Sequence, residues 1–168
     1  RQATPSMTAS SGVVIAGTVE ATGTGTITVR GTGGSNLSII ATRGVNVDGG
    51  KILGGSGNVT IEGRGGETNG TGNYGVELSG VGAEITSTGG DISITGFGGG
   101  DAGTASGQNA GVRVDRLVQA GGGGKVTIAG TGGSGTGGSQ VGVRVDSSGE
   151  VKAISGDIEL TGTGGGTD

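Results

Sequence analysis

The chain of 168 residues has no cysteine, histidine or tryptophan, and it has only one proline, one phenylalanine and one tyrosine. The lack of cysteine excludes disulfides. The scarcity of aromatic side chains argues against a thick globular core, because aromatic rings supply much of the buried area in such cores. The sequence also lacks the run of about 20 apolar residues that a membrane-spanning helix needs. We therefore expect a narrow aliphatic core and no membrane insertion.

Net charge and glycine content exclude further classes of fold and of partner. The net charge is −4, from 10 basic and 14 acidic residues, which argues against a nucleic-acid partner because such proteins need a basic face. Glycine fills 47 of the 168 positions, but it does not recur at every third residue with abundant proline, as collagen requires. Plentiful, regularly placed Val, Ile and Thr argue against disorder. The class that remains is a repeat protein built from short β-strands and glycine turns.

Two short motifs recur in a fixed order along the chain. One is a glycine followed by alternating apolar residues, and the other is an apolar-alternating segment that ends in glycine. The first reads GVVIA, GVNVD, GVELS, GVRVD and GVRVD, and the second reads TITVRG, NVTIEG, DISITG, KVTIAG and DIELTG. Between them lies a weaker apolar position, at Val19, Ile52, Ile85, Val118 and Val151.

This pattern predicts the fold class and the domain organisation. Alternation with period two is typical of β-strands, and repetition of one strand order at a nearly fixed period indicates a β-solenoid. We predict an all-β, single-stranded parallel β-helix of about five coils of 31–36 residues, each with three short strands and one variable glycine-rich loop. Residues 1–11 would form a lead-in segment and residues 12–168 the repeat domain, with coils that start near residues 12, 44, 75, 111 and 142.

The alternation also predicts which side chains stack inside the coils. Like residues recur in the same column, and β-branched residues suit this packed, pleated surface. The predicted stacking core comprises Val45, Val47, Val76, Leu78, Val112, Val114, Val143, Val145, Val59, Ile61, Ile92, Ile94, Val126, Ile128, Ile158 and Leu160.

Glycines close each predicted third strand, and there we expect a turn with positive φ. The segment after each of them varies in length, so we expect protruding loops at one corner of the solenoid. In the first loop, Leu37, Ile39 and Ile40 predict an extra strand. The glycines concerned are Gly31, Gly63, Gly96, Gly130 and Gly162.

Charged residues fall in columns that face solvent. We expect Glu77 beside Arg113 and Arg30 beside Glu62, and the column Asp91, Lys125, Asp157 alternates in sign. Exposed cross-strand pairs contribute roughly a few tenths of a kcal/mol each, but they favour one register. We interpret the columns as register-setting ladders. The residues left as candidates for a further role are Arg113, Asp115, Arg144 and Asp146.

Catalysis and metal binding find little support. Polysaccharide cleavage needs carboxylates roughly 5–9.5 Å apart, or a base beside a metal. Asp115 and Asp146 fall on neighbouring coils, but arginines flank them, histidine is absent and we identify no aromatic platform for a sugar. We expect no enzyme activity, no catalytic residues and no cofactor. The calcium nonapeptide GGxGxDxUx is not matched, so Asp101, Asp115 and Asp146 are only weakly predicted calcium ligands.

The segments TITVRGTGG, NVTIEGRGG, KVTIAGTGG and DIELTGTGG resemble repeats of very large secreted bacterial β-solenoid proteins. Filamentous-haemagglutinin-type adhesins and autotransporter passenger domains are the nearest group. The resemblance covers nearly the whole chain from Gly12 onward. It implies a right-handed parallel β-helix, export to the cell surface or the medium, and a role in adhesion, matrix or filaments. It carries no catalytic residues.

We therefore expect a structural or adhesive extracellular β-solenoid of bacterial type, part of a filament or of a very long surface protein. Open solenoid ends expose unpaired strand edges, which favour the addition of another coil. The partner would be a second copy in a head-to-tail homopolymer or neighbouring repeats of a longer chain, with a host-cell or matrix surface as a further partner. The alternatives are a carbohydrate-active β-helix enzyme and a module that binds carbohydrate or another ligand through its loops.

Overall fold

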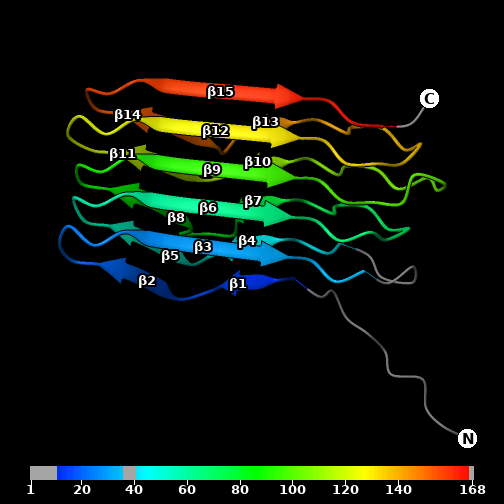
Figure 1. Ribbon diagram of the computed structural model, residues 1–168, viewed down its shortest axis with the longest axis horizontal. Helices are drawn as coiled ribbons and strands as arrows, with labels where there is room; N and C mark the ends of the chain where they lie inside the picture. The colour runs from blue at the N-terminus through cyan, green and yellow to red at the C-terminus, as the bar shows by residue number, and fades with distance from the viewer. Residues whose placement is uncertain (1–10, 36–40, 167–168) are drawn as a thin grey trace, which may run out of the picture.

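The computed structural model describes residues 11–35 and 41–166. These residues form fifteen β-strands and no helix. The strands make three parallel sheets of five strands each, and the chain visits each sheet once per coil (Figure 1). From the first to the fifth strand of a sheet the chain winds through about four turns. The predicted all-β parallel solenoid is thereby confirmed. Residues 1–10 of the predicted lead-in segment 1–11 lie outside the described residues, as does the extra strand predicted from Leu37, Ile39 and Ile40.

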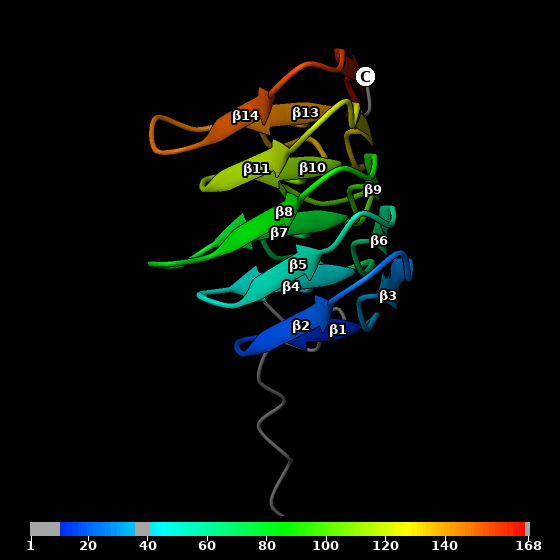
Figure 2. The same cartoon turned by 90° about the vertical axis from the view of Figure 1, so that its left-hand side faces the viewer.

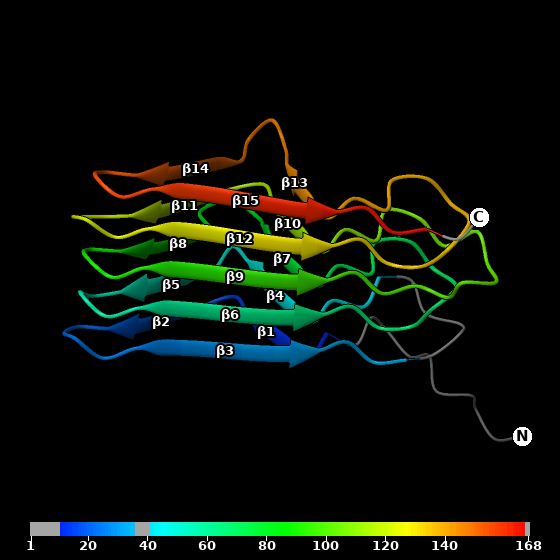
Figure 3. The ribbon, with the colours of Figure 1, turned by 45° about the horizontal axis from the view of Figure 1, so that its top comes forward.

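The three sheets take the three strands of each coil in turn. Figure 2 shows the first two of these sheets side by side, and Figure 3, like Figure 1, shows the third sheet in front. Sheet A consists of β1 (Val13–Ile15), β4 (Val45–Asp48), β7 (Val76–Ser79), β10 (Val112–Val114) and β13 (Val143–Val145). Sheet B consists of β2 (Thr18–Ala21), β5 (Lys51–Gly54), β8 (Glu84–Ser87), β11 (Leu117–Ala120) and β14 (Glu150–Ala153). Sheet C consists of β3 (Ile27–Thr32), β6 (Val59–Arg64), β9 (Ile92–Phe97), β12 (Val126–Thr131) and β15 (Ile158–Thr163).

The strand register places equivalent residues of successive coils side by side. Val45 pairs with Val76, and Ile61 pairs with Ile94. Inward side chains from the three sheets meet in one narrow aliphatic core. The predicted core residues on the second to fourth coils are buried. On the fifth coil, where no described coil lies above, Val145, Ile158 and Leu160 are 42%, 46% and 48% exposed.

The glycines that we expected to form turns with positive φ do something else, and that prediction is wrong. Gly31, Gly63, Gly96, Gly130 and Gly162 lie inside the sheet C strands, and none of them has a positive φ. Their role is close approach: a Cβ on Gly96 would lie 2.0 Å from the carbonyl oxygen of Gly111 on the next coil. The same clash, at 2.0–2.1 Å, occurs at Gly31, Gly63 and Gly130. The missing side chain lets the backbones of sheets C and A meet at a tight corner.

The variable loops gather at the corner where the chain leaves sheet C and returns to sheet A, as predicted. They follow the arrowheads of β3, β6, β9 and β12 on the right of Figure 1. Backbone hydrogen bonds connect one loop to the next, such as Gly100 N to Gly66 O (3.0 Å) and Gly133 N to Asn109 O (2.7 Å). The loops are therefore stacked in the same way as the coils. The described residues contain no helix long and apolar enough to cross a membrane.

Candidate functional site

The outer face of sheet A carries a network of ion pairs around Glu77. Glu77 is only 2% exposed, and it accepts hydrogen bonds from Arg43 Nε (2.5 Å) and Arg113 NH1 (2.6 Å). Arg113 Nε also binds Asp146 Oδ2 at 2.7 Å, and Arg144 binds the other oxygen of Asp146. The expected contact between Glu77 and Arg113 is thus confirmed, and it belongs to a chain of five charged side chains over four coils.

An aromatic ring completes this network. Tyr74 is buried beside Glu77, and the guanidinium groups of Arg43 and Arg113 lie 5.9 and 5.6 Å from its ring centroid. Cation–π contact of this kind stabilises a partly desolvated arginine. Burial raises the pKa of the Tyr74 hydroxyl. Sequence reasoning missed Tyr74 and Arg43, although both immediately precede the recurring first-strand glycine.

The electrostatics favour the charged forms of Asp146 and Arg113. Burial alone would raise the pKa of Asp146, but the hydrogen bonds from Arg113 and Arg144 outweigh it and lower the pKa. Burial likewise opposes the charge on Arg113, yet its bonds to Asp146 and Glu77 raise its pKa. A carboxylate that stays ionised has no proton to donate. This arrangement therefore suits ion pairs that fix the strand register rather than general acid catalysis.

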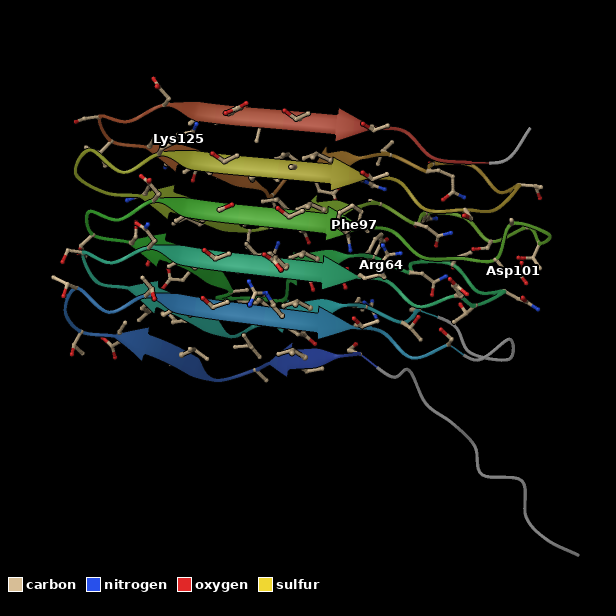
Figure 4. The ribbon with its side chains drawn as sticks, viewed as in Figure 1. Arg64, Phe97, Asp101 and Lys125 are labelled. Carbon is tan, nitrogen blue, oxygen red and sulfur yellow. The ribbon has the colours of Figure 1, made fainter. Side chains whose placement is uncertain are left out.

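The structure does not bring the three weakly predicted calcium ligands together. Asp146 is engaged by two arginines, and Asp115 pairs with Arg116 (3.3 Å) on its own coil. Asp101 lies out in the loop corner, where its Oδ1 accepts the Gly103 N–H at 3.1 Å (Figure 4). Among the described residues no group of three or more acidic side chains is placed to hold a metal ion.

On sheet C, one predicted ion pair forms and another changes partner. Arg30 Nε binds Glu62 Oε2 at 2.7 Å, as expected, and this hydrogen bond lowers the pKa of Glu62. Lys125 stands in the alternating column, but its ammonium binds Glu159 Oε2 at 3.1 Å. Asp91 instead accepts the backbone N–H of Lys125 at 2.8 Å. Asp91 and Lys125 are neighbours on successive coils, as the sequence predicts, but the ammonium group of the flexible lysine reaches Glu159 in the next outward-facing column.

A buried polar ladder runs along the inner side of the loop corner. It was not predicted. The Asn73 side-chain oxygen accepts the Thr42 N–H (3.0 Å) and the Thr68 hydroxyl (2.9 Å), and the Asn73 N–H in turn donates to Asn109 Oδ1 (3.0 Å). Gln140 continues the ladder by donating to Ser106 O at 2.9 Å. The signal was present: a polar residue stands two positions before each first-strand glycine from Gly44 onward.

A shallow groove of about 420 Å³ lies on the outer face of sheet C, over the first three coils. Its floor is a grid of two residues from each of three adjacent strands, because Arg30, Glu62 and Thr95 share one column and Thr32, Arg64 and Phe97 share the next. Phe97 is 40% exposed, and the Arg64 guanidinium lies 5.2 Å from its ring centroid (Figure 4). This exposed ring, which the strand register places beside Arg64, was not identified from the sequence.

Comparisons of the chain with protein-family models, with curated proteins and with solved structures found no match. The β-solenoid itself therefore stands on the strand register and the burial pattern alone.

Proposed function

We propose that this protein is a structural and adhesive module of a bacterial cell-surface or secreted filament, which assembles by stacking coils end to end. The adjoining coil comes from a second copy of the chain or from neighbouring repeats of a longer one. The resemblance of the repeats to adhesin and passenger-domain repeats supports the cellular setting. The observation that carries the proposal is the exposed stacking core of the fifth coil.

The exposed surface consists of side chains that a further coil would bury. Inside the solenoid, every inward side chain is covered by its equivalent on the next coil. On the fifth coil Val145, Ile158 and Leu160 keep the same orientation but are almost half exposed. Full burial of an aliphatic side chain stabilises by about 1.5–3 kcal/mol, so covering these three adds roughly 3 kcal/mol on this face of the interface alone.

The first coil offers a matching surface. Continuing the register of each sheet by one coil would place Val145 against Ile15, and Leu160 against Val29, which share their columns. In sheet B the column that ends in Lys152 begins with Glu20, so opposite charges would meet. Glu20 has no ion pair within the described residues. Matching columns and complementary charge support a heterologous contact that adds coils without closing.

Sedimentation velocity over a range of protein concentrations tests the proposal. We expect the chain to form longer species as its concentration rises, and Leu160→Lys to block this because a charge would be buried in the added interface. Thr163→Lys is the matched control, since it adds the same charge on the outer face of the same strand, where the uncharged Thr32 of the added coil would lie opposite, and it should assemble normally. A chain that stays monomeric up to millimolar concentration would contradict self-stacking, as would normal assembly of Leu160→Lys.

A tandem protein with the whole 168-residue sequence written twice, which keeps a connecting segment between β15 of the first copy and β1 of the second, tests the form with neighbouring repeats. We expect its free energy of unfolding to exceed twice that of one copy, because the new coil interface adds a nearest-neighbour term. Two halves that unfold like separate single copies would contradict this form.

A further inference from the structure

The groove on sheet C contains a cation with no carboxylate partner. Every other described lysine and arginine forms an ion pair with an aspartate or glutamate. Within the described chain Arg64 forms none, and its guanidinium lies only against the Phe97 ring. Since the protein carries a net charge of −4, an uncompensated arginine beside an exposed aromatic ring is a local exception.

The fold does not require Arg64 and Phe97 at their positions. Thr32, Thr131 and Thr163 occupy the same column in the other coils where that column is described, so the sheet is built equally well with threonine. Arg64 and Phe97 replace this small residue on two consecutive coils. The replacement opens a platform next to the Arg30–Glu62 pair and the Thr95 hydroxyl.

We propose that this groove binds an anionic saccharide, that is, a pyranose polymer that carries carboxylate or sulfate groups. The Arg64 guanidinium pairs with the anionic group, since its planar fork matches such oxygens. The exposed carbons of Phe97 pack against the apolar face of a sugar ring. Arg30, Glu62 and Thr95 supply donors and acceptors for sugar hydroxyls.

The dimensions of the grid suit a sugar chain. Outward residues on one strand are about 7 Å apart, and adjacent strands are about 4.8 Å apart, so the grid measures roughly 7 by 10 Å. A nucleic acid is held by a basic face that contacts several phosphates, whereas this groove offers one arginine without a carboxylate partner and one exposed ring, which suits a single charged sugar unit. The inference rests on the adhesive role proposed above, but it does not depend on coil stacking.

Binding to immobilised polysaccharides at low protein concentration, where the chain is monomeric, tests the inference. The probes are polygalacturonate for the carboxylate, chondroitin sulfate for the sulfate, dextran as a neutral sugar and polyglutamate as an acidic peptide. We expect saturable binding to one or both anionic polysaccharides and none to dextran or polyglutamate. The two anionic probes show which group Arg64 prefers.

The variants use residues that the column already contains. Arg64→Thr should weaken binding at least tenfold, and Phe97→Thr about fivefold, with the circular dichroism spectrum unchanged. Lys125→Gln is the matched control, because it removes one positive charge from the same side of the solenoid, away from the groove (Figure 4), and it should change affinity less than twofold.

Several outcomes would overturn the inference: no binding to either anionic polysaccharide, equal binding to polyglutamate, or an equal loss in Lys125→Gln, which would indicate general electrostatics. Coil stacking is scored separately by sedimentation, so failure here leaves the stacking proposal standing, and failure of stacking leaves this groove testable.

Discussion

The glycine column at the corner between sheets C and A allows a sharp test with one methyl group. In Gly96→Ala, the new Cβ would lie 2.0 Å from Gly111 O and 2.7 Å from Val112 Cγ2. Ordinary contacts between such atoms are about 3.5 Å, so the strand and the next coil must separate by more than 1 Å. The backbone φ is not positive there, so no backbone strain adds to the clash in the folded state.

The magnitude follows from two opposing contributions. Overpacking in a close-packed interior costs about 1–3 kcal/mol, or more when backbone must move. Replacing glycine by alanine also restricts the unfolded chain, which stabilises by about 0.4–1 kcal/mol. We therefore expect Gly96→Ala to lower the free energy of unfolding by about 2 kcal/mol. The urea midpoint should fall by about 1 M, given a slope near 2 kcal/mol/M.

Two control variants make the result interpretable. Gly123→Ala, in an open turn with no atom within 4 Å of the new Cβ, should be neutral or slightly stabilising. Gly162→Ala occupies the same column as Gly96, but its nearest contact is Val143 N at 3.2 Å, so it should cost much less in the monomer. Urea unfolding of all three variants, followed by circular dichroism, decides the matter. Equal stability of Gly96→Ala and Gly123→Ala would refute the close-approach argument.

Two further changes probe the polar parts of the structure. Asn73→Ala leaves the buried Thr42 N–H and Thr68 hydroxyl without their acceptor, and each loss costs about 1–3 kcal/mol. The midpoint temperature of thermal unfolding should fall by several degrees in Asn73→Ala. Asn69→Ala, at an exposed position, should leave the midpoint unchanged. An unchanged midpoint in Asn73→Ala would contradict a stabilising role of the polar ladder. The pKa of Asp146 is lowered in the folded state, so its contribution is present above the unfolded pKa of about 3.9 and is lost as pH falls below it. Asp146→Asn should therefore flatten the dependence of stability on pH below about pH 4, and an unchanged slope there would show that the carboxylate is not held ionised.

Much of the fold could be predicted from the sequence because the coils of a solenoid repeat, so that each coil can be aligned with the others in the same chain. The period of the glycines and the alternation around Val45 or Ile61 determine strand, face and register together. The reason for the third-strand glycines could not be predicted, because the approach of Gly111 to Gly96 depends on how two sheets meet. The same holds for the groove: Arg64 and Phe97 are ordinary residues in the sequence, and only the column register places them side by side.

Cryo-electron microscopy of the concentrated chain tests the stacking of coils most directly. The account predicts rods longer than one chain, of single-solenoid width, with coils repeating at about 4.8 Å along the axis. It also predicts that Gly162→Ala folds but forms no rods, because its Cβ would meet the carbonyl oxygen of the added coil as Gly130 would meet Gly142 at 2.0 Å. Particles of single-chain length at every concentration, or rods of normal length from Gly162→Ala, would contradict it.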